Sequence, residues 1–125
     1  LTPDPSSFAD SYALIKVLNQ KHRVKNFSIV CNFVKNEHEG MMLYSRFQDV
    51  VSRFLNVKLD YLGSIPSDQE LEKATQQQRL IMRQSPLSES SKAISKICAQ
   101  VERSRNHKVV YGGLEGFWEQ VVGIA

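Results

Sequence analysis

Polar residues that could contact a planar ligand follow two short apolar runs of this 125-residue chain. Asn32 follows the first run, 27–31. Three more polar or turn-forming residues follow the second run, 58–65: Pro66, Ser67 and Asp68. An Asn side chain complements the N6 amino group and N7 of adenine, and a proline offers a flat apolar surface to a base. The alternative is structural, because Asn is common in turns and Ser and Asp commonly cap helices.

The remaining reactive residues form no catalytic constellation. The histidines are scattered in polar contexts, and the run 37–39 (Glu-His-Glu) is interpreted as a solvated helix start rather than a metal site. None of the six glycines is followed by Lys-Ser or Lys-Thr, so the chain lacks a phosphate-binding loop and should not hydrolyse ATP alone. The two cysteines, Cys31 and Cys98, are far apart, which excludes a disulfide scaffold and favours a reducing compartment.

The helices and strands that the sequence predicts alternate along the chain, and this order predicts an α/β fold with parallel strands. A helix is expected from Ser6, capped by Ser6 or Ser7, and a short one from Ser67, whose spacing to Glu70 fits a capping box. Strands are expected at 27–31 and 58–65, longer helices at 37–55 and 88–103, and a charged linker at 103–108. Ligands bind at the carboxyl ends of parallel strands, where Asn32 and the 66–68 run lie.

Two strands are too few for a parallel-sheet domain, because such sheets are covered on both faces and usually have more strands. The chain also starts at Leu1, without Met, in the loop-like run 3–5 (Pro-Asp-Pro). We therefore expect the chain to be the second half of a larger domain.

The end of the chain carries an amphipathic helical pattern. Its apolar positions recur at helical spacing: Leu114, Phe117, Trp118, Val121 and Val122. The opposite face holds Glu115, Glu119 and Gln120. Three readings stay open, namely a membrane surface, a partner groove and the protein's own core. The acidic face favours docking on protein, since anionic lipid would repel it.

Composition sets further limits. The chain is 42% hydrophobic and 23% charged, as in ordinary globular domains, and 125 residues suit one domain. A net charge of +3 is no nucleic-acid signature by itself, so no direct nucleic-acid contact is expected. No apolar run approaches the ~20 residues of a membrane span.

The order of several motifs resembles the MinD/ParA-type ATPases, and within them the flagellar-number regulators FlhG and FleN. The similar runs cover nearly the whole chain: 3–16 (PDPSSFADSYALIK), 30–34 (VCNFV), 53–57 (RFLNV), 61–68 (YLGSIPSD), 73–74 with 78–79, 86–88 and 113–117 (GLEGF).

The resemblance implies the C-terminal portion of a deviant-Walker, SIMIBI-type P-loop fold. Residues 1–105 would form that portion, 106–112 a linker and 113–125 an amphipathic helix. It also implies that Asn32 and the 66–68 loop lie beside adenine, with ATP and Mg²⁺ bound by the full-length protein.

The resemblance further implies an ATP-dependent homodimer and a terminal helix that attaches to membrane in the ATP state. Its partners would be a σ54-dependent flagellar activator, which it restrains, and the GTPase FlhF. The location would be cytoplasmic or peripheral at the inner membrane or cell pole, and the full-length parent an ATPase. The alternative is a non-catalytic interaction module of the same descent, which binds a partner through its surface and terminal helix.

Overall fold

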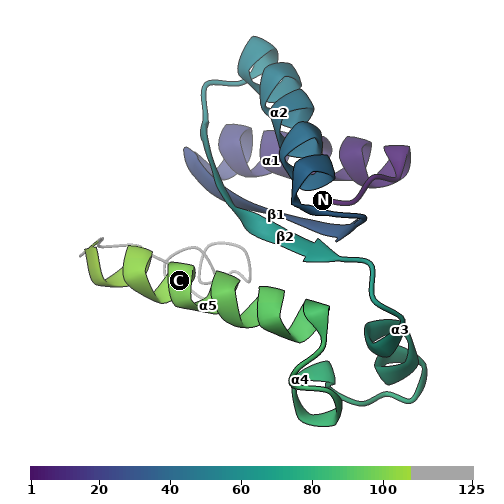
Figure 1. Ribbon diagram of the computed structural model, residues 1–125. Helices are drawn as coiled ribbons and strands as arrows, with labels where there is room; N and C mark the ends of the chain where they lie inside the picture. The colour runs from purple at the N-terminus through teal and green to yellow at the C-terminus, as the bar shows by residue number, and fades with distance from the viewer. Residues whose placement is uncertain (108–125) are drawn as a thin grey trace.

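The computed structural model describes residues 1–107, which form two strands and five helices in alternating order (Figure 1). The elements in chain order are α1 (Pro5–His22), β1 (Asn26–Val34), α2 (Glu37–Phe54), β2 (Lys58–Pro66), α3 (Gln69–Gln76), α4 (Ile81–Gln84) and α5 (Glu89–His107). The predicted α/β order is therefore confirmed for this part of the chain. The expected terminal helix at 113–125 lies outside the described residues.

The two strands pair in parallel, as the alternation of elements predicts. Asn26 lies opposite Lys58 at one end, and Val34 lies opposite Pro66 at the other. The register shifts twice, between Ile29 and Val30 and between Asn32 and Val34. The carboxyl ends of β1 and β2 consequently meet at one edge of the sheet.

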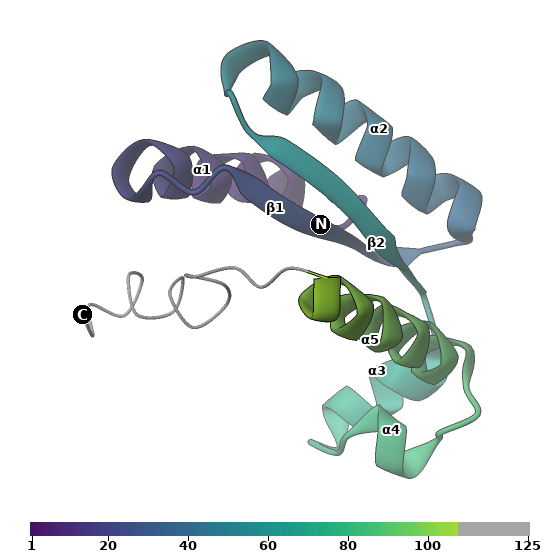
Figure 2. The same ribbon diagram turned by 90° about the vertical axis from the view of Figure 1, so that its left-hand side faces the viewer.

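The helices cover both faces of the strand pair. Figures 1 and 2 show α2 on one side of the sheet and α5 on the opposite side, while α1 lies alongside β1. The main core lies between the strands and the helix pair α1 and α2. Its buried members are Ile15, Ile29, Cys31, Val34, Leu43, Phe47, Val51, Leu55 and Leu59.

The second face is less fully covered. On α5 the apolar residues Ala93, Ile94 and Ile97 are half-buried, whereas Cys98 and Val101 are exposed. Ile97 lies over Gly63, where a Cβ would meet the Ile97 side chain at 3.1 Å. The apolar side of α5 thus contacts β2 through its first half.

Three expected helix ends are corrected by the structure. Asp4, rather than Ser6 or Ser7, caps α1, because Pro5 begins the helix and the Asp4 carboxylate accepts a hydrogen bond from the Ser6 N–H at 2.9 Å. Asp68, rather than Ser67, caps α3. The expected linker from Arg103 is helical as far as His107, since no proline or glycine interrupts α5.

None of the helices in residues 1–107 is long and apolar enough to cross a membrane.

Candidate functional site

The structure brings the two predicted polar groups to the same edge of the sheet. Asn32 lies opposite Ile65 near the end of β1, and the Ser67 N–H donates to the Val34 carbonyl at 2.7 Å. This bond extends the strand pairing one residue past β2 and holds Ser67 beside the end of β1. The expectation that both segments end at one edge is confirmed.

Asn32 is exposed, and its side-chain oxygen accepts a hydrogen bond from the Phe33 N–H at 2.8 Å. Its amino group makes no hydrogen bond with the described residues and can donate to a ligand. Phe33 itself has φ 60°, a conformation that bulky L residues rarely adopt, and its side chain is 53% exposed. Phe33 is the extra residue at the second register shift, so Val34 returns to the core while the ring of Phe33 points outward.

Phe33 was missed by sequence reasoning. No glycine, asparagine or proline marks position 33, so the run 30–34 gives no signal of a left-handed residue.

Asp68 has a different setting from Asn32. One carboxylate oxygen accepts from the Glu70 N–H at 2.9 Å and caps α3. The other accepts from the Ser90 N–H at 3.1 Å and from the Ser90 hydroxyl at 2.7 Å. These hydrogen bonds, led by that from the Ser90 hydroxyl, hold the pKa of the Asp68 carboxyl below its ordinary value. The Asp68 carboxylate therefore links the start of α3 to the start of α5. Its bond to the Glu70 N–H is the helix cap that the structural alternative predicts.

Pro66 and Ser67 line a hollow of about 630 Å³ between β2, the start of α2 and α5. Three lysines line the same hollow: Lys35, Lys92 and Lys96. Lys92 pairs with Glu89 at 3.6 Å across an exposed surface. Asn32 and Asp68 are not among the lining residues, so the hollow joins only two of the four predicted site residues.

The side chains at this edge have the chemistry to bind a ligand. The described residues contain no cluster of three His, Cys, Asp or Glu side chains that could hold a metal ion. The amide of Asn32, the Pro66 ring and the lysines can bind a flat polar ring or an anion.

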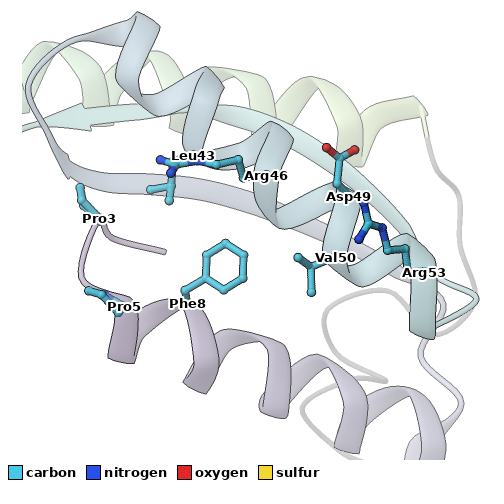
Figure 3. A pocket seen from close by; sticks show the side chains of 8 residues that line it. All are labelled: Pro3, Pro5, Phe8, Leu43, Arg46, Asp49, Val50 and Arg53. Carbon is cyan, nitrogen blue, oxygen red and sulfur yellow. The ribbon is translucent and has the colours of Figure 1, made fainter.

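A second hollow, of about 500 Å³, lies between α1 and α2 (Figure 3). Its lining comes from the start of α1 and one side of α2: Pro3, Pro5, Phe8, Leu43, Arg46, Asp49, Val50 and Arg53. Sequence reasoning did not single out this surface.

Comparison with known proteins finds two relatives among curated sequences. The chain is 36% identical over 119 residues to the antiactivator FleN of Pseudomonas aeruginosa, which covers 95% of this chain and 42% of FleN. It is 31% identical over 97 residues to the flagellum site-determining protein YlxH of Helicobacter pylori, which covers 77% of this chain and 32% of YlxH. The chain thus spans less than half the length of either relative. No protein-family model matches the chain.

Proposed function

Because this chain belongs with the FleN- and FlhG-related proteins of the MinD type, we propose that it works as part of a regulator of flagellar number, placement and gene expression. The observation that carries the proposal is the 36% identity to FleN across 95% of the chain. Both relatives bear names that concern flagella or the restraint of an activator. The α/β order and the parallel strand pair are compatible with part of a P-loop NTPase-like fold.

The proposed regulator binds ATP and Mg²⁺ through a SIMIBI-type domain, of which residues 1–105 form the C-terminal part. Asn32, Pro66 and Ser67 would lie at the adenine, and Asp68 would hold their loop against α5. The free amino group of Asn32 and its place at the same edge of the sheet as Ser67 support this assignment.

The remaining proposals concern partners and location. The regulator forms an ATP-dependent homodimer, restrains a σ54-dependent flagellar activator and acts with the GTPase FlhF. Residues 106–112 link the domain to a helix at 113–125, which attaches to a partner or to the membrane at the cell pole. The similarity to an antiactivator supports the restraint of an activator.

The experiment for the regulatory role is disruption of the gene followed by a count of flagella per cell. We expect more flagella and higher expression of activator-dependent flagellar genes, restored by the wild-type gene. Unchanged flagella and unchanged transcription would contradict the proposal.

Nucleotide binding is tested in the full-length product of the gene by titration with ATP. Asn32→Ala removes the whole amide, and Asn32→Asp keeps the oxygen that accepts from the Phe33 N–H while it removes the amino donor. Both variants should weaken ATP binding by about tenfold, since one directed hydrogen bond to a ligand is worth roughly 1–2 kcal/mol. Unchanged affinity in both would remove Asn32 from the base site.

A second function is a non-catalytic interaction module of the same family. The engagement of both Asp68 oxygens by α3 and α5 favours it, because that carboxylate has a structural use without any nucleotide. This function predicts that ATP leaves the thermal unfolding temperature of the gene product unchanged. A rise in that temperature with ATP favours the nucleotide-binding regulator, since a ligand of the native state stabilises it.

A further inference from the structure

The surface between α1 and α2 has an apolar floor. Phe8 of α1 meets the buried ring of Phe47 edge-on, with 5.0 Å between ring centroids and an interplanar angle of 88°. Leu43 and Val50 continue this floor along α2. At the end of the helix Phe54 is 70% exposed, with its ring edge-on to Tyr12 at 6.5 Å. We call the surface formed by Phe8, Tyr12 and the α2 positions 43–54 the α1–α2 groove.

The apolar positions of this groove follow one face of α2. Leu43, Phe47, Val50 and Phe54 recur at intervals of three or four residues, which places them in one stripe. The inner part of the stripe is covered by α1, whereas Val50 is half-buried and Phe54 is open. From position 43 to 54 the stripe is about 16 Å long, the length of a helix of about 11 residues.

Two arginines of α2 lie beside the apolar residues of the groove. Arg46 and Arg53 are exposed, lie seven residues apart and so are about 10 Å apart along the axis of α2. In the described part of the chain neither forms an ion pair, because the three salt bridges there join other residues. Asp49 lies between the two arginines on α2 and lines the same hollow, so two arginines and one aspartate leave its margin with a net positive charge (Figure 3).

An apolar floor flanked by unpaired arginines is complementary to an acidic amphipathic helix. A helix of that kind covers Val50 and Phe54 with its apolar side, and its carboxylates, two turns apart, reach the guanidinium groups. Arginine suits this contact because its planar fork binds a carboxylate through two parallel hydrogen bonds. Recognition of a helix in an apolar groove is a common mode of peptide binding.

We propose that the α1–α2 groove is a docking site for an acidic amphipathic helix of a partner protein. The inference gives the proposed regulatory function a contact surface and does not depend on nucleotide binding. Figure 2 shows α2 and α5 on opposite sides of the sheet, and neither Asn32 nor the 66–68 loop is among the residues that line the groove hollow.

The test is photo-cross-linking in the native host. The gene product carries p-benzoylphenylalanine in place of Phe54, an exposed aromatic position, and in a matched control in place of Leu87, which is 81% exposed on the far side of the fold. We expect Phe54, and not Leu87, to cross-link another protein at a segment with helical apolar spacing and Asp or Glu at its margins. Absence of cross-links at Phe54 above those at Leu87 overturns the proposal.

Charge reversal tests the arginines. Arg46→Glu with Arg53→Glu should lower the Phe54 cross-link by about tenfold or more, since a charge-assisted hydrogen bond is worth roughly 1.5–3 kcal/mol. Arg79→Glu with Arg83→Glu makes the same change of charge on another surface and should leave the yield unchanged. Equal yields in both pairs contradict the charged contact.

The mass of the cross-linked peptide identifies which molecule occupies the α1–α2 groove. A cross-link to residues 108–125 of the same chain, or to a second copy, assigns the groove another occupant and overturns the proposal. The count of flagella in the disrupted strain is independent of these results, so the docking site can fail while the regulatory function stands.

Discussion

The carboxylate of Asp68 joins α3 to α5 through Ser90, whose N–H and hydroxyl donate to one oxygen at 3.1 and 2.7 Å. Ser90 is fully buried, so its hydroxyl has no access to water and finds its shortest hydrogen bond at this acceptor. The same carboxylate caps α3 through its other oxygen. One side chain thus fixes the direction in which the chain leaves the candidate site.

Asp68→Ala should lower the free energy of unfolding by about 2 kcal/mol, since it removes a helix cap and leaves the buried Ser90 hydroxyl with only its longer contact to the Ser88 hydroxyl at 3.3 Å. The measurement is urea unfolding at neutral pH. Asp49→Ala is the control, because Asp49 is exposed and its side chain makes no hydrogen bond with the described residues; it should cost less than about 0.5 kcal/mol. Equal effects of the two substitutions would show that the Asp68–Ser90 contact does not stabilise the fold.

Stability should also depend on pH through Asp68. The pKa of its carboxyl is lowered in the folded state, so the folded state binds this proton less readily than the unfolded state. The stabilisation is present above the ordinary carboxyl pKa and is lost as the pH falls through the lowered pKa. Unfolding between about pH 2 and 6 should show this loss, and Asp68→Asn should reduce it. An identical pH profile in the variant would contradict the assignment.

Local patterns were sufficient to predict the helices and strands near the core. Leu43, Phe47 and Val51 recur at helical spacing and are buried on α2, and the strand from 58 was predicted to within one residue. Asn32 and Pro66 were placed correctly at one edge, although β1 continues past the predicted end at Asn32 to Val34 and β2 includes Pro66. Such features depend on neighbouring residues along the chain, which the sequence displays directly.

Contacts between distant residues were not predictable from such patterns. Asp68 and Ser90 are 22 residues apart, and either could have been an ordinary cap on its own helix. The left-handed Phe33 results from a register shift between two strands and has no residue signature. From the sequence alone, Arg46 and Arg53 are expected on a solvated helix face. Only the fold shows that they line a hollow together with Phe8 of α1.

Gly40→Ala should destabilise the protein by about 1–3 kcal/mol, the usual cost of overpacking. Gly40 is buried where α2 crosses β2, and a Cβ there would lie 2.9 Å from Ser64 Cβ and closer still to its hydroxyl. The readout is the urea midpoint. Ser64→Gly should recover part of the loss when combined with Gly40→Ala, although alone it removes a hydroxyl that contacts Tyr61. Additive losses in the double variant would show that the two residues do not clash.

Arg23→Gly should stabilise the protein by about 0.5–1 kcal/mol. Arg23 ends α1 with φ 57°, and its N–H donates to the Asn19 carbonyl at 3.0 Å. Its side chain is exposed, so glycine removes the strain of the left-handed conformation and little else. Thermal unfolding provides the comparison, with Lys21→Gly inside the same helix as the control. That control should destabilise by about 1 kcal/mol, and a loss of stability in both variants would contradict the role given to Arg23.

Tyr61 should make the fold sensitive to alkali. Burial raises the pKa of its hydroxyl to about 12. The Glu37 carboxylate, to which this hydroxyl donates at 2.8 Å, raises the pKa further, whereas the hydrogen bond with Ser64 lowers it. The folded state therefore keeps this proton when the unfolded state has lost it, and stability falls as the pH rises above the ordinary tyrosine value of about 10. Ultraviolet absorbance of the phenolate should show one tyrosine titrating near this raised pKa, absent in Tyr61→Phe. The variant should lose stability at neutral pH with its hydrogen bonds, yet change less between neutral and alkaline pH. A parallel decline in both proteins would contradict the assignment.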